Sequence, residues 1–210
     1  MSQPPLDPNP DVEFILANAD RLITVTFRCV ISFGLADGLN ELLLKSTTDR
    51  LDPWRQPVLG FQRDGLLMAA LRAAILLDAG PKLVSFRAVN HRLMLPGVEA
   101  ALLQALQDRH GPDDAMSART ELIAEFRKVY TEIDWKVYDR LKHFRNRGIA
   151  HLTVEKLLKS VIIDELKTMV GIIGRLALVL RDLSGSNLAF HPDIQQEYAE
   201  LAKKAIKPPG

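Results

Sequence analysis

The side chains best suited to chemistry in this sequence are concentrated between residues 136 and 147. Five fixed positive charges and one acid lie there: Lys136, Asp139, Arg140, Lys142, Arg145 and Arg147. The stretch therefore carries +4, whereas the whole chain carries +1. Cations at the C-terminal end of a helix offset its macrodipole, each by roughly 0.3–1 kcal/mol. Phosphate binding is the alternative use for such a cluster.

A motif within this stretch adds a titratable group. Arg145 and Asn146 are followed by His151, with five residues between the arginine and the histidine. Arginine binds phosphate through two parallel hydrogen bonds, and histidine changes its charge near neutral pH. The alternative for His151 is a structural role at a helix start, and an asparagine such as Asn146 often just accepts an unusual backbone shape at a helix end.

Helices must position these residues, because glycine and proline cluster between segments of helical periodicity. The spacing predicts helices over Asp11 to Gly34 (extending to Leu44), Phe61 to Asp78 at the centre of a bundle, Ser85 to Leu93, Val98 to Arg109, and Pro192 to Ile206. Residues 45–60 contain two prolines and are predicted to form a long loop held by Trp54. We expect an all-α domain over residues 11–206, with disordered tails at 1–10 and 207–210.

Two long amphipathic helices are expected to flank the motif. The first begins at Asp113 or Asp114 and buries an apolar stripe of Leu122, Phe126, Val129, Ile133, Val137, Leu141 and Phe144. It breaks at Gly148, and Thr153 caps the second, which continues beyond Leu180. Gly171 and Gly174 lie inside that second helix, which predicts that another backbone packs closely against them.

Several classes of site are excluded by what the sequence lacks. Its five histidines and single cysteine give no zinc-ligand spacing, and it contains no nucleotide-binding glycine motif and no nucleophile elbow. We therefore expect neither a metal nor a cofactor. Cys29 lies in an apolar run and is predicted to be a buried thiol, which fits a reducing cytoplasm. No apolar stretch suggests a membrane span, and residues 1–10 do not resemble a signal peptide.

The segment from Phe144 to Leu152 resembles the HEPN motif, in which an arginine and a polar residue precede a histidine where a long helix breaks. From about Phe61 to Leu180 the chain is similar to the abortive-infection AbiU-like branch of HEPN proteins. That resemblance implies a HEPN-like helical bundle that forms homodimers and, in active members, cleaves RNA without a metal. It also implies a role in phage defence or in a toxin–antitoxin pair, with an antitoxin or other regulatory protein as partner.

The resemblance assigns roles to named residues. His151 is the expected general base for the ribose 2′-hydroxyl, and Arg145 binds the scissile phosphate and disfavours protonation of the histidine. Asn146 orients one of these groups, while Lys142, Arg147 and Arg140 contact phosphates. Two motifs facing each other across a two-fold axis form one composite site. A catalytically silent module that binds RNA, a nucleotide or a protein is the alternative function, and a purely structural helical dimer is a third.

Other residues have less specific interpretations. Some HEPN toxins carry a tyrosine two residues after the motif histidine, where a partner enzyme adds AMP. This chain has Thr153 there, so we do not expect that regulation. Tyr130, Trp135 and Tyr138 either stack nucleobases or pack in the core or dimer interface. A second basic face formed by Arg87, His91 and Arg92 is expected to be solvated.

Overall fold

The computed structural model describes residues 9–45, 53–80, 82–111, 116–149 and 162–206, and among these residues it contains helices and no strand, which confirms the all-α prediction. The elements are α1 (Pro10–Lys45), α2 (Arg55–Leu76), α3 (Phe86–Leu93), α4 (Val98–His110), α5 (Met116–Thr131), α6 (Trp135–His143), the π-helical segment η1 (Phe144–Ile149), α7 (Ile163–Ser184) and α8 (Ile194–Ala205).

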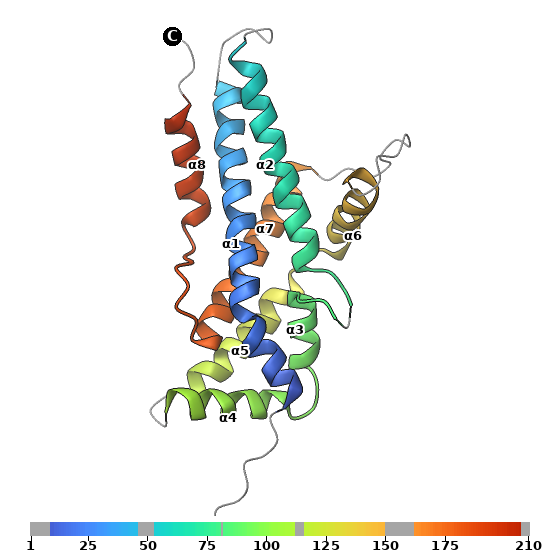
Figure 1. Cartoon of the computed structure of the whole chain (residues 1–210), viewed down its shortest axis with the longest axis vertical. Coiled ribbons are helices and arrows are strands. Elements are labelled where there is room, and N and C mark those ends of the chain that lie inside the picture. The colour runs from blue at the N-terminus through green and yellow to red at the C-terminus, as the bar shows by residue number, and fades with distance from the viewer. Residues whose placement is uncertain (1–8, 46–52, 81, 112–115, 150–161, 207–210) are drawn as a thin grey trace, which may run out of the picture.

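The long helix α1 is the centre of the bundle. Helices α2, α7 and α8 pack along it, and α4 crosses near its N-terminal end (Figure 1). The side chain of Asn9 accepts hydrogen bonds from the backbone N–H groups of Asp11 and Val12, at 3.0 and 3.4 Å. Asn9 thus caps α1, and the helix includes Pro10, so it begins one residue before the predicted boundary.

Close backbone packing occurs at Gly34 and Gly38 of α1, and not at the predicted Gly171 and Gly174. A Cβ atom at Gly34 would lie 2.4 Å from the carbonyl oxygen of Gln195, and one at Gly38 would lie 2.2 Å from that of Ala199. At Gly171 nothing lies within 4 Å, and at Gly174 the nearest atom is a side-chain methyl at 3.8 Å. The glycines of α1, spaced one helical turn apart, therefore let α8 approach closely.

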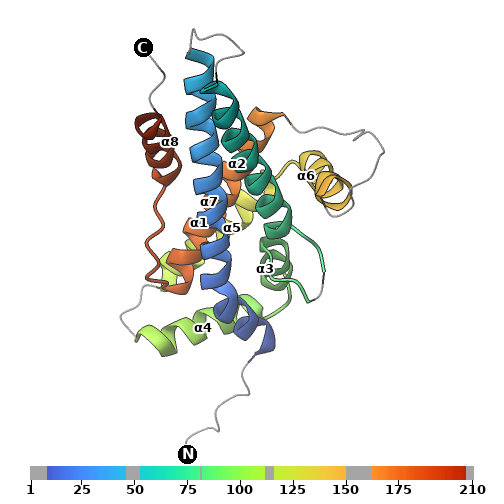
Figure 2. The same ribbon diagram turned by 45° about the horizontal axis from the view of Figure 1, so that its top comes forward.

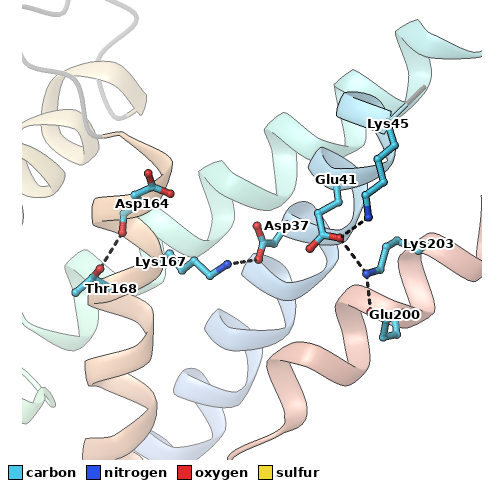
Figure 3. A network of polar contacts seen from close by, with 8 residues as sticks. All are labelled: Asp37, Glu41, Lys45, Asp164, Lys167, Thr168, Glu200 and Lys203. Atoms are coloured by element: carbon cyan, nitrogen blue, oxygen red, sulfur yellow. Dashed lines mark hydrogen bonds and ion pairs between the residues drawn. The ribbon is translucent and has the colours of Figure 1, made fainter. Parts of the chain in front are cut away.

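Polar contacts fasten the same helices together at the surface (Figure 3). Lys203 of α8 pairs with Glu41 of α1 at 3.1 Å and with Glu200 at 2.5 Å, while Lys167 of α7 pairs with Asp37 of α1 at 2.9 Å. In each pair one partner is at least 41% exposed, so solvent screens the interaction and each pair adds little stability by itself.

The prediction that α2 is buried at the centre of the bundle is wrong. Its small residues Ala69, Ala70, Ala73 and Ala74 face the core, and Ile75 and Phe61 are 48% and 64% exposed. The alanines and Gly65 allow α2 to lie close to α1: a Cβ at Gly65 would be 2.9 Å from that of Ala36. The helix also begins at Arg55, inside the predicted loop, because Pro57 occupies the first turn, where its missing N–H costs no helical hydrogen bond.

The predicted long helix before Gly148 is two helices and a π-helical segment. After Thr131 the chain turns, and Asp134 caps α6 by accepting hydrogen bonds from Lys136 N and Val137 N at 2.8 and 3.3 Å. The apolar stripe survives the break, since Val129, Ile133 and Val137 are all buried. Figures 1 and 2 both place α6 on the α2 side of the bundle, away from α8.

The remaining predictions have different outcomes. Ser85 caps α3 as expected, accepting from Ala88 N at 3.1 Å, and Cys29 is fully buried. The proposed caps at Asp113 or Asp114 and at Thr153 lie outside the described residues, as do 1–8 and 207–210 of the predicted tails.

Candidate active site

The motif begins where α6 changes into η1. Arg145 and Asn146 are the second and third residues of η1, and Arg147 is the fourth. A π-helical segment is a rare distortion that often occurs at functional sites, and it changes the direction in which successive side chains project. Arg145 and Asn146 therefore occupy an irregular backbone next to the C-terminal end of α2.

Arg145 is held by two acceptors. Its Nη1 donates to Oδ2 of Asp78 at 2.5 Å, and its Nε donates to Oδ1 of Asn146 at 3.0 Å. The arginine and aspartate side chains are only 22% and 15% exposed. A guanidinium carries five N–H groups, and these contacts use two of them. The arrangement fixes the direction of Arg145 and retains donors for an oxyanion.

Asp78 is the hub of this cluster. Its Oδ1 accepts a hydrogen bond from the hydroxyl of Tyr138 at 3.1 Å, and from its neighbour Ala79 N at 2.9 Å. The carbonyl oxygen of Asp78 accepts from Ser85 Oγ at 2.7 Å, which ties the end of α2 to the cap of α3. The contacts of Asp78 therefore join the end of α2 to α3, α6 and η1.

The same contacts shift two pKa values in opposite directions. Burial raises the pKa of the Asp78 carboxyl, but hydrogen bonds from Arg145, Ala79 and Tyr138 together with the charge of Arg145 hold it below its ordinary value. Burial, the Asp78 charge and the hydrogen bond to it raise the pKa of Tyr138 to about 12. Asp78 is thus charged and Tyr138 neutral at physiological pH.

The other predicted site residues differ in their contacts and exposure. Arg140 forms an ion pair with Glu165 of α7, which occupies its guanidinium. Lys142 is partly exposed on α6. His151 and the side chain of Arg147 lie outside what the structure describes. The cluster therefore unites Arg145 and Asn146, while the approach of His151 to them stays a prediction.

The sequence did not reveal that Asp78 contacts both Arg145 and Tyr138. Asp78 stands 67 residues before Arg145, and only the tertiary packing of α2 against α6 and η1 brings them together. The sequence feature that could have drawn attention to Asp78 is its position as a single acidic residue directly after an apolar helix.

The aromatic residues of this region form one group. The ring of Trp135 lies between Tyr130 and Tyr138, with centroid distances of 5.6 and 5.5 Å. Tyr138 is buried, whereas Tyr130 and Trp135 are partly exposed. The guanidinium of Arg87 covers the Trp135 ring, 5.0 Å from its centroid. Tyr138 is thus a core residue, and Trp135 belongs to a mixed basic and aromatic surface.

Comparison with family models, curated proteins and solved structures found no match for this chain. Among the described residues, no group of three or more His, Cys, Asp or Glu side chains is arranged to hold a metal ion. Helix α1 is the one described helix that is long and apolar enough to cross a membrane, and 56% of its most apolar window is buried in the bundle. Burial of that kind is also found in the core helices of proteins that do not enter membranes.

Proposed function

We propose that this protein is a metal-independent endoribonuclease of the HEPN type, acting in phage defence by abortive infection or in a toxin–antitoxin stress response. The observation that supports it best is the fixed guanidinium of Arg145, held by Asp78 and Asn146 in the motif that resembles HEPN. An arginine whose direction is set before substrate arrives loses less entropy on binding a phosphate and gives stronger transition-state stabilisation.

The reaction uses a nucleophile that RNA itself carries. His151 removes the proton of a ribose 2′-hydroxyl, and that oxygen forms a bond to the adjacent phosphorus. The bond from phosphorus to the 5′-oxygen breaks, and the leaving oxygen takes a proton from solvent, so that a 2′,3′-cyclic phosphate and a 5′-hydroxyl result. Arg145 stabilises the charge that develops on the phosphorane oxygens.

The neighbouring residues assist. Asn146 orients Arg145 through its side-chain oxygen, a role that the 3.0 Å contact supports. Lys142 and Arg147 bind flanking phosphates. Arg140 joins them only if its ion pair with Glu165 opens. We propose that two chains form a homodimer whose motifs face one composite cleft, and that the protein works in the cytoplasm under the control of an antitoxin or other partner.

Cleavage in the absence of metal tests the proposal. Purified protein is incubated with mixed RNA in EDTA at pH 7.5, beside Arg145→Ala and His151→Ala. Matched controls are Arg175→Ala, which removes an exposed arginine paired with Glu132, and His191→Ala, which removes an exposed histidine. We expect cyclic phosphate ends from the wild type and both controls, and a loss of at least a hundredfold in the two motif variants. Equal cleavage by all five proteins would identify a contaminating nuclease and contradict the proposal.

A catalytically silent module that binds RNA, a nucleotide or a partner protein is the alternative, and one observation favours it. The ion pair at 2.5 Å between Arg145 and Asp78 competes with any phosphate for the same guanidinium. Asp78→Asn distinguishes the two functions, because it removes the competing charge and keeps a hydrogen-bond acceptor. Tighter RNA binding without cleavage in either protein would support the silent module, whereas slower cleavage would support a positioning role for Asp78.

A further inference from the structure

The surface where α3 and α6 begin has a feature that the proposed chemistry does not use. Trp135 is the first residue of α6, and the Arg87 guanidinium from the first turn of α3 lies over its ring at 5.0 Å. Trp135 is partly exposed and Arg87 is exposed. None of the ion pairs among the described residues involves Arg87. An exposed guanidinium that has no carboxylate partner among the described residues lies over a partly exposed indole, and both are planar groups of the kind that stack on a nucleobase.

The indole contacts two further aromatic rings. Tyr130 and Tyr138 contact it with interplanar angles of 57° and 79°, so their rings support the indole without stacking flat on it. The charge of Arg87 lowers the pKa of both tyrosines, although burial outweighs it and both values are raised. Arg87 therefore lies close to the whole aromatic group, yet its exposed side chain is free to adjust when a planar ligand arrives.

A chain of contacts connects this surface to the proposed scissile position. Trp135 packs on Tyr138, the Tyr138 hydroxyl donates to Asp78, and Asp78 pairs with Arg145. The indole is therefore linked, through the buried ring of Tyr138, to the carboxylate that pairs with the Arg145 guanidinium.

We propose that Trp135 and Arg87 form a nucleobase-stacking subsite for single-stranded RNA. The proposal rests on the proposed function, and it names the substrate class of that site. A base stacks on the indole and the guanidinium covers its other face or its edge. Duplex RNA is disfavoured, because its bases are already stacked and paired. The subsite accepts all four bases, since every base has a π-face.

The test compares RNA with and without a base at each position. The probe is a 2′-O-methyl oligoribonucleotide, which lacks the nucleophile and is not cleaved, together with a series in which one position at a time is abasic. Affinity is measured by fluorescence anisotropy for the wild type, Arg87→Gln and Trp135→Leu. Trp54→Phe is the matched control, because Trp54 packs in a separate small cluster with Leu39, Leu43 and Val58 at the other end of α2.

We expect one or two abasic positions to weaken wild-type binding about tenfold, the usual effect of one stacked base. Arg87→Gln and Trp135→Leu should bind the intact probe about tenfold more weakly than the wild type, and their affinity should not fall further when those positions are abasic. Trp54→Phe should behave like the wild type. Arg87 is exposed, so Arg87→Gln decides the result if Trp135→Leu disturbs the aromatic group. An abasic series without effect, or equal base dependence in the wild type and Arg87→Gln, would overturn the subsite.

The cleavage assay shows whether the stacking subsite and the proposed ribonuclease activity fail together or separately. Cleavage that depends on Arg145 and His151, together with a flat abasic series, removes the subsite and keeps the enzyme. Base-dependent binding through Trp135 without cleavage removes the enzyme and keeps the subsite. Failure of the probe to bind at all overturns the subsite.

Discussion

Arg145 and Asp78 illustrate how much a single contact can depend on tertiary structure. Each residue alone is a charged side chain at a helix end, where charge is common. Together, only 22% and 15% exposed, they form the polar centre of the junction between α2, α3 and α6. The pairing predicts effects on both stability and titration.

Asp78→Asn is expected to lower the free energy of unfolding by about 2 kcal/mol, because it leaves a partly buried guanidinium without its anion. Urea denaturation followed by circular dichroism measures the change. Glu132→Gln is the control, since it breaks the solvent-exposed ion pair with Arg175 and should change stability little. Equal effects of the two substitutions would show that the Asp78 contact is no stronger than a surface pair.

Tyr138 predicts a titration at high pH. In the folded protein its pKa is raised to about 12, whereas an unfolded tyrosine ionises near pH 10. The folded state therefore retains a proton that the unfolded state loses, so this contribution to stability is complete below about pH 10 and declines as pH rises toward 12. Absorbance at about 295 nm should show a late-ionising tyrosine that disappears in Tyr138→Phe. An unchanged titration in that variant would contradict the assignment.

Sequence reasoning located the charged and titratable residues of the motif but not their partners. Arg145, Asn146 and the surrounding cations are adjacent in the chain, so their types and spacing suffice to select them. The roles of Asp78 and Trp135 become apparent only from tertiary contacts. Asp78 pairs with Arg145, and Trp135 lies under Arg87. A local pattern carries no information about such pairs.

At the scale of elements, helical periodicity predicted burial better than it predicted continuity. The stripe that includes Val129, Ile133 and Val137 suggested one helix, and all three residues are buried. Asp134 interrupts the helix because its side chain caps the next one. Hydrophobic periodicity does not detect a helix break when the apolar stripe keeps its phase across it. The sequence feature that indicated this break was Asp134, an aspartate inside an otherwise helical pattern.

Asp134→Ala is expected to destabilise the protein by about 1 kcal/mol, the typical cost of removing a helix cap. Thermal unfolding measures it, and Asp134→Ser, which restores a capping oxygen, should recover most of the loss. No recovery by serine would mean that the cap contributes nothing and that the break has another cause.

The glycines of two helices give a matched pair of substitutions. Gly38→Ala places a methyl group 2.2 Å from the Ala199 carbonyl oxygen, so α8 must move, and a loss of about 1–3 kcal/mol is expected. Gly171→Ala meets nothing within 4 Å and should stabilise α7 by about 0.5–1 kcal/mol. Chemical denaturation of both variants measures the difference, and the same sign for both would refute the proposed packing.

At the scale of the whole molecule, charge is nearly balanced while its distribution is not. A net charge of +1 gives no overall attraction to RNA, so the proposed binding depends on the local cations of residues 136–147. Two of these cations, Arg140 and Arg145, are paired with Glu165 and Asp78. The length of the RNA should therefore matter less than its access to this segment.

The proposed composite site requires two chains. Light scattering during size-exclusion chromatography should give about twice the monomer mass of 23.5 kDa, and specific activity should fall on dilution as the dimer dissociates. Full specific activity in a sample shown to be monomeric would contradict the composite site while leaving the ribonuclease intact.

The reactivity of the Cys29 thiol can report transient separation of α1 from α2. Its Sγ lies 3.3 Å from the Ala69 carbonyl oxygen between α1 and α2, and burial raises the pKa of the thiol to about 12. No Cys29 thiolate is therefore available to attack a disulfide reagent unless these two helices separate. The labelling rate measures how often the centre of the bundle opens, and a lower rate in the presence of RNA would show that the proposed substrate stabilises the packing of α1 against α2.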